Sequence, residues 1–193
     1  FEKQIKSMFP NNTIVRLPGL FGIGLKKNIL YDLIYRVPSF ISCDYKNTLN
    51  PDELAILETY YITDQMGNLI LKYHPNEFNV EELKIFLTEK LKYDSLSFTN
   101  RNSTFQFYDL SDISMHINYI IGKEIKLAHL VPEPISVNEL VSSISNYNFH
   151  YTSATQINYN VSSKYLNNYL GKYLYDKSTT IRKIKEFIGR NCK

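Results

Sequence analysis

The order of local patterns at the start of the chain is the feature that most restricts its fold. Residues 1–9 place their apolar side chains on one face of a helix. The β-branched segment 13–17 predicts a strand, a glycine-containing loop follows it, and residues 28–35 return to helical spacing before Pro38. Helix, strand, loop and helix in this order predict an α/β fold.

The first helix pattern begins without a helix start signal. Phe1 is not an initiator methionine, and no Ser, Thr, Asp or Asn stands before it to cap the helix. We therefore expect a helix that is entered midway, with further sequence upstream. A trimmed N-terminal methionine is the alternative interpretation.

The middle of the chain has a different character. Residues 60–63 and 69–73 flank a turn that contains Gly67, which predicts a β-hairpin. Asn79 and Glu82 then resemble a capping box that opens an amphipathic helix. We expect residues 41–96 to form an insertion or a subdomain.

Alternating strand and helix patterns return in the last part of the chain. They are a strand at 104–110, a helix from Ser111 to Gly122, a strand at 125–131, a helix capped by Ser136 with Glu139, and a last helix ended by Gly189.

Charge and cysteine content exclude several classes of protein. The 22 basic and 19 acidic residues are dispersed and leave a net charge of +3, so no nucleic-acid partner is expected. No apolar run approaches the length of a membrane span, so no membrane partner is expected either. Cys43 and Cys192 lie far apart and the histidines are scattered, which argues against a metal site and favours the reducing cytoplasm.

One polar and aromatic stretch, at residues 97–108, has the residue types of a ligand site. Arg101 offers a planar cation that can hold a phosphate with two hydrogen bonds, and Asn102 and Gln106 offer amides for a ligand rich in hydroxyls. An ordinary loop that enters a strand is the alternative interpretation of this stretch.

Five segments together resemble the extended short-chain dehydrogenase/reductases, the NAD-dependent epimerase/dehydratase family. They occur in the family's order and cover most of the chain outside 41–96. The segments are Thr13-Ile-Val-Arg-Leu-Pro-Gly-Leu-Phe-Gly22, Lys26-Lys-Asn-Ile-Leu-Tyr-Asp32, Phe105-Gln-Phe-Tyr-Asp-Leu-Ser-Asp-Ile113, Glu133-Pro-Ile-Ser-Val-Asn-Glu-Leu140 and Tyr159-Asn-Val-Ser-Ser-Lys164.

The resemblance implies roles for residues in the first two segments. Pro18, Gly19 and Leu20 would offer backbone contacts to the cofactor, NAD or NADP. Asn28 would contact the nucleotide part of the substrate, with Ile29 in place of the family's usual Leu.

The departures from the family pattern matter as much as the matches. Phe105 stands where many nucleotide-sugar enzymes carry an Arg that binds the pyrophosphate, so either Arg101 substitutes for it or the substrate is not a nucleotide diphosphate sugar. The family's dinucleotide fingerprint and its catalytic Tyr-x-x-x-Lys should precede Phe1.

Two Tyr-x-x-x-Lys matches occur within the chain, and both come too late for the family's pair. Tyr119 with Lys123 and Tyr173 with Lys177 fit the spacing by which a Lys lowers the pKa of a Tyr hydroxyl for proton transfer. Because 16 tyrosines make such matches expected by chance, we interpret both pairs as structural and assign no catalytic residue.

These inferences predict the last strands of a Rossmann-like parallel sheet plus the C-terminal substrate-binding subdomain of such an enzyme. Residues 1–40 would end the catalytic helix and supply a sheet strand and the ligand loop, 41–96 the insertion, and 97–193 the substrate-binding subdomain. The expected function is the substrate-binding part of an NAD(P)-dependent sugar or nucleotide-sugar epimerase, dehydratase or reductase, an oxidoreductase or isomerase that is inactive as this piece alone. Exposed strand edges would favour association, including a homo-oligomer.

Two alternatives stay open at this point. One is a non-catalytic sugar-binding or interaction module on the same scaffold. The other is an unrelated small α/β domain, which loses support if strands 13–17 and 125–131 are parallel neighbours in one sheet.

Overall fold

The computed structural model describes residues 1–145, 149–163 and 171–191 and shows a mixed α/β chain. Lys164, from the last of the five segments, and Cys192 lie outside the described residues. The α-helices are α1 (Glu2–Met8), α2 (Ile29–Tyr35), α3 (Cys43–Lys46), α4 (Pro51–Tyr60), α5 (Val80–Ile85), α6 (Ile113–Gly122), α7 (Val137–Ile144) and α9 (Lys177–Asn191). The strands are β1 (Ile14–Arg16), β2 (Gly19–Phe21), β3 (Phe40–Ile41), β4 (Tyr61–Thr63), β5 (Leu69–Leu71), β6 (Thr104–Phe105), β7 (Phe107–Asp109), β8 (Leu127–His129) and β9 (Ile135–Ser136).

Two parallel strand pairs form the centre of the larger part of the molecule. β1 pairs with β8, with Ile14 opposite Leu127, and β2 pairs with β7, with Gly19 opposite Phe107. The predicted strands at 13–17 and 125–131 are therefore parallel neighbours. Helix α6 connects β7 of one pair to β8 of the other. This arrangement confirms the α/β class and weakens the alternative of an unrelated domain.

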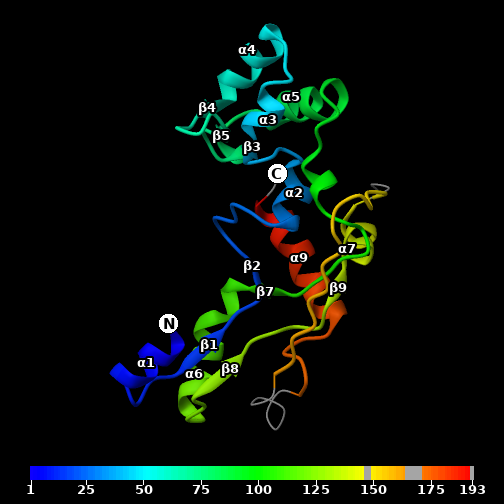
Figure 1. Ribbon diagram of the computed structural model, residues 1–193. Helices are drawn as coiled ribbons and strands as arrows, with labels where there is room; N and C mark the ends of the chain where they lie inside the picture. The colour runs from blue at the N-terminus through cyan, green and yellow to red at the C-terminus, as the bar shows by residue number, and fades with distance from the viewer. Residues whose placement is uncertain (146–148, 164–170, 192–193) are drawn as a thin grey trace.

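The alternation of residues along β7 divides the core into two layers. Phe107 is buried with Phe21 against residues of α7 and α9, whereas Tyr108 is buried in a second cluster with Ile120 of α6. Figure 1 shows α9 running alongside β7, with α6 near the paired strands β1 and β8. Neighbouring residues of one strand thus anchor helices on opposite sides.

The middle of the chain builds a separate lobe with its own core, seen at the top of Figure 1. β3, β5 and β4 form an antiparallel sheet in that order, which confirms the hairpin expected at 60–73. Gly67 in its turn has φ +84, and a Cβ there would lie 2.9 Å from Cys43 Sγ, so glycine is required. The core residues of the lobe are Val37, Ile41, Leu57, Tyr61, Leu69, Leu83 and Leu87.

Three local expectations are wrong. Ser111 does not cap α6, because a short 3₁₀ turn (Leu110–Asp112) precedes the helix and the Asp109 carboxylate accepts the Ser111 N–H at 2.9 Å. Gly189 does not end the last helix, which continues to Asn191. The strand expected at 104–110 is divided into β6 and β7, which pair with different partners.

Candidate functional site

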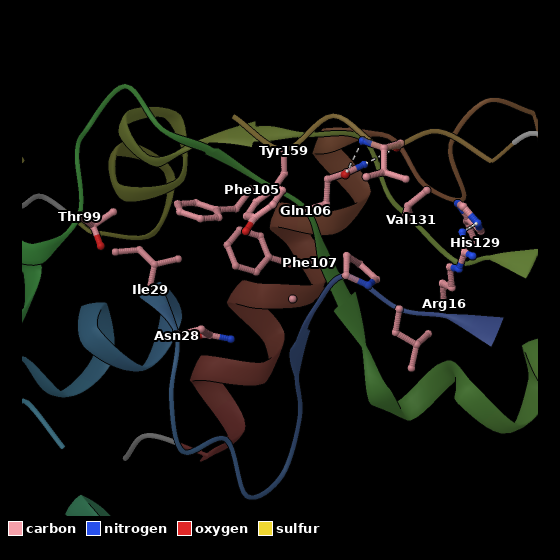
Figure 2. Close-up of a pocket in the computed structure, with 14 residues that line it drawn as sticks. Arg16, Asn28, Ile29, Thr99, Phe105, Gln106, Phe107, His129, Val131 and Tyr159 are labelled. Carbon is pink, nitrogen blue, oxygen red and sulfur yellow. Dashed lines mark hydrogen bonds between the residues drawn. The ribbon is translucent and has the colours of Figure 1, made fainter. Parts of the chain in front are cut away.

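A cavity of about 650 Å³ opens where segments far apart in the sequence converge (Figure 2). The end of β1 with the loop into β2 forms one wall, and the start of α2 forms another. β6 and β7 supply a third wall, and the extended segment near Tyr159 covers it. The lining residues are Arg16, Leu17, Pro18, Gly19, Asn28, Ile29, Thr99, Phe105, Gln106, Phe107, His129, Val131, Tyr159 and Val161.

Three aromatic rings dominate the interior of this cavity. Phe105 has its ring centroid 6.2 Å from that of Phe107 and 5.8 Å from that of Tyr159. Phe107 is buried, Phe105 is half-buried, and Tyr159 is 53% exposed. In Figure 2 the three rings lie together between the Arg16 and His129 side and the side of Asn28, Ile29 and Thr99. Such a group of rings presents an apolar surface to a flat or cyclic ligand.

Asn28 holds the wall formed by α2. Its Oδ1 accepts the N–H groups of Leu30 at 2.9 Å and Tyr31 at 3.3 Å, so it caps the helix. Its Nδ2 donates to the carbonyl oxygen of Leu20 at 2.8 Å, which ties the helix to β2. The backbone of Asn28 has φ 150 and ψ −178, a region that side chains rarely adopt and that occurs mainly where surrounding structure enforces it.

Gln106 fixes the cover of the cavity. Its buried amide donates from Nε2 to the carbonyl oxygens of Pro132 at 2.7 Å and Val161 at 2.8 Å, and its Oε1 accepts the Val161 N–H at 2.9 Å. Both amide hydrogens and one acceptor position are therefore used within the protein. Gln106 positions the wall and is not aimed at a ligand.

Arg16 and His129 form the polar end. Arg16 donates from Nε and Nη2 to the Glu2 carboxylate at 2.8 and 2.6 Å, and its Nη1 lies 3.0 Å from His129 Nε2. The bond from Arg16 lowers the pKa of Glu2. Burial lowers the pKa of His129, and the nearby Arg16 charge lowers it further. Because a guanidinium only donates, neutral His129 accepts at Nε2 and carries its proton on Nδ1.

The cavity brings together most of the residues expected to bind ligands, but not all of them. Pro18, Gly19, Asn28, Ile29 and Gln106 line it. The remaining three expected residues, Leu20, Arg101 and Asn102, are not among the lining residues.

The three residues outside the cavity have structural contacts instead. Leu20 contributes its carbonyl oxygen to Asn28, as described above. Arg101 donates from Nη2 to Asn138 Oδ1 at 2.7 Å, and the Asn102 N–H is bound by Asn100 Oδ1 at 2.9 Å. Arg101 is thus not placed where it would replace a pyrophosphate-binding Arg at Phe105.

The sequence interpretation missed several lining residues. Phe107 and Phe105 alternate along the predicted strand, and this spacing could have indicated a shared aromatic wall. Tyr159 and His129 enter the cavity only through the tertiary fold, so no local pattern marks them as site residues.

A second polar cluster lies on the α6 side of β7, around buried His116. Its Nδ1 is 2.7 Å from Tyr108 Oη, and its Nε2 is 3.2 Å from Tyr175 Oη, which donates to Asp112 at 2.8 Å. Lys183 pairs with Asp112 at 2.9 Å. Burial lowers the pKa of His116 and raises the pKa of both tyrosines. Every polar group named here has a partner, so the cluster fastens α6 to the C-terminal segment.

Neither Tyr-x-x-x-Lys match lines the cavity. Tyr173 donates to Asn160 Oδ1 at 2.6 Å, and Lys177 pairs with Glu139 at 3.0 Å, while Lys123 follows α6 as its C-cap. Across the described ranges, no group of three His, Cys, Asp or Glu side chains is arranged to hold a metal ion. Nor does any helix in the described part have the length and apolar character needed to cross a membrane.

No family model, curated protein or solved structure matches this chain. Its function therefore has to be inferred from the chemistry of the cavity and from the sequence resemblance.

Proposed function

We propose that this chain supplies the substrate-binding part of an NAD(P)-dependent epimerase, dehydratase or reductase that acts on a sugar-type ring in the cytoplasm. One observation carries the proposal. The residues that the family resemblance relates to cofactor (Pro18, Gly19) and to substrate (Asn28, Ile29) line one cavity. The parallel pairing of β1 with β8 also supports it.

Gly19 at the start of β2 lets the backbone pass close to β7 beside the cavity. A Cβ on Gly19 would lie 3.1 Å from the Gln106 carbonyl oxygen, so the chain passes β7 closely here. Beside it, Leu17, Val131 and Phe107 give apolar walls suited to a nicotinamide ring. When bound, NAD(P) would exchange a hydride with a ring carbon of the substrate.

The residues of this chain would bind and orient the substrate rather than move its proton. The rings of Phe105, Phe107 and Tyr159 would hold its apolar face and exclude water from the reacting carbon. Asn28 keeps a second Nδ2 hydrogen beyond the bond to Leu20, and this hydrogen can bind a substrate oxygen. The proposal requires a dinucleotide fingerprint and a Tyr–Lys pair from polypeptide outside these 193 residues.

A non-catalytic sugar-binding or interaction module is the second candidate. It is favoured by the absence of a Tyr–Lys pair among the described residues that line the cavity. The same cavity would then bind a ligand without catalysing a reaction.

The coding sequence before Phe1 and a titration with NADH separate these candidates. The proposal predicts an upstream GxxGxxG strand-turn-helix and a Tyr-x-x-x-Lys, with no micromolar binding of NADH by the 193-residue chain alone. An upstream frame without these motifs would favour the binding module. Micromolar binding of NADH by the chain alone would show that the cofactor site is not completed elsewhere.

A further inference from the structure

We infer that the cavity selects an uncharged substrate, a cyclic alcohol or ketone with an apolar ring face, and discriminates against substrates that carry a phosphate or diphosphate. This inference rests on the proposed function and narrows its substrate class. Two observations support it. Three aromatic side chains line the cavity, and the charge of Arg16 is balanced by the Glu2 carboxylate.

The three aromatic residues of the cavity differ in burial and together form an apolar surface for a ligand ring. Phe107 forms the buried floor, Phe105 is half-buried beside it, and Tyr159 stands at the open rim. Interplanar angles of 48° and 50° at Phe105 turn the three rings toward a shared space rather than into one stack (Figure 2). A ligand ring can therefore contact more than one of them at once.

The cavity offers no uncompensated cation among its described lining residues. Arg16 is the one Arg or Lys in that set, and each of its three guanidinium nitrogens already faces a partner, Glu2 or His129. Burial and the neighbouring guanidinium lower the pKa of His129, and Nε2 faces an Arg16 nitrogen that can only donate. A diphosphate that entered would meet an Arg16 whose charge Glu2 already offsets, so it would gain less from ion pairing than it loses in hydration.

The polar groups that remain suit a neutral ligand. The Thr99 hydroxyl and the second Nδ2 hydrogen of Asn28 lie on one side, and the Tyr159 hydroxyl belongs to the rim (Figure 2). These groups bind carbonyl and hydroxyl oxygens without requiring charge on the ligand. A positively charged side chain in place of Phe105 would instead favour a phosphorylated ligand.

Two matched ligand pairs test the inference on the 193-residue chain by chemical-shift titration. The pairs are uridine with uridine 5′-diphosphate, and glucose with glucose 1-phosphate. We expect the neutral member of at least one pair to bind, with its phosphorylated partner weaker by about tenfold or more, corresponding to one charge left unpaired. Tighter binding of the phosphorylated member in either pair would overturn the inference, as would no binding by either neutral compound.

Variants test whether the aromatic rings are responsible for binding the neutral ligand. Tyr159→Ala should weaken the neutral ligand about tenfold. Tyr73→Ala is the matched control, because Tyr73 is similarly exposed, at 60%, but lies in the separate lobe. Phe105→Arg should shift the preference toward the phosphorylated member. An affinity that Tyr159→Ala leaves unchanged would place the ligand elsewhere and overturn the inference.

Failure of this inference is distinguishable from failure of the proposed function. Neutral rings that bind to a protein without NAD(P)-dependent turnover would contradict the function but not the ligand class. Turnover that requires phosphorylated substrates would support the function and contradict the ligand class.

Discussion

The ring of Phe105 lies with its centroid 5.8 Å from that of Tyr159, at an angle of 50°. Backbone hydrogen bonds set this distance, because Thr104 donates to Ile157 at 2.8 Å and Tyr159 donates to Thr104 at 3.0 Å. The segment that carries Tyr159 is thus attached to β6 beside the cavity. The aromatic wall is a consequence of strand-like pairing between distant parts of the chain.

Asn28 links helix capping to the shape of the cavity, and two substitutions separate its contributions. Asn28→Ala should cost about 1–2 kcal/mol of unfolding free energy, because it removes the cap of α2 and keeps the strained φ of 150. Asn28→Gly should cost less, since glycine tolerates that backbone conformation. Urea unfolding of both variants measures this, and a glycine variant less stable than the alanine variant would refute the account.

Gln106 should be needed for the cover of the cavity. Gln106→Leu removes three hydrogen bonds and leaves the Val161 and Pro132 backbone groups without their side-chain partner, at a cost of about 2–4 kcal/mol. Amide exchange at Val161 should become faster. Gln156→Ala, at an exposed position, serves as the control and should change neither quantity. Unchanged exchange at Val161 in Gln106→Leu would contradict the assigned role.

Asp32 on α2 should make the protein less stable as the pH rises. Burial, together with the nearby charge of Asp94, raises the pKa of Asp32 to about 7, although the Ser95 side chain and the charge of Lys27 oppose the shift. Below the ordinary pKa both the folded and the unfolded state hold the proton, so nothing is lost. As the pH rises toward 7, the unfolded state ionises first and stability falls.

Asp32→Asn tests this directly. The variant should be more stable than the native chain by about 2–4 kcal/mol at pH 8, because each pKa unit corresponds to about 1.4 kcal/mol, and nearly equal to it at pH 4. Asp64→Asn is the control, because its effect on stability should depend on pH in the opposite direction. Hydrogen bonds from Asn68 lower the pKa of Asp64, so its contribution is present at neutral pH and lost in acid. An equal effect of Asp32→Asn at both pH values would contradict this account.

His116 should make the protein sensitive to acid. Burial lowers its pKa, so below pH 6.5 the unfolded state takes up the proton before the folded state, and stability falls as the pH decreases. His116→Gln removes the titrating group, so its unfolding free energy should change less between pH 7.5 and 5. Thermal melts across this range provide the measurement. Parallel pH curves for the two proteins would show that His116 is not responsible.

Local sequence patterns predicted the elements whose determinants lie within a few residues. The hairpin around Gly67, the end of α6 at Gly122 and the capping of α7 by Ser136 all follow from such patterns. Helix α4 was overlooked, although Asn50 and Glu53 form a capping box with Pro51 at its start. That information was present in the sequence.

Other features depend on contacts that no local pattern contains. The strand at 104–110 divides at Gln106 because its amide binds Pro132 and Val161, both distant in sequence. Tyr159 lines the cavity because backbone hydrogen bonds join its segment to Thr104, which is distant in sequence. Of the expected ligand residues, Pro18, Gly19, Asn28, Ile29 and Gln106 line the cavity. Arg101 has the chemistry of a phosphate ligand, but it donates to Asn138 instead.

The central claim is that this cavity binds the substrate of an NAD(P)-dependent reaction. Its most direct test is the steady-state oxidation of NAD(P)H by the product of the whole reading frame that encodes this chain, using a neutral cyclic ketone as substrate. The account predicts turnover in which Tyr159→Ala raises KM by about tenfold with kcat nearly unchanged, since it removes binding energy common to substrate and transition state, and in which Tyr73→Ala changes neither. No turnover, or turnover that Tyr159→Ala leaves unchanged, would contradict the claim.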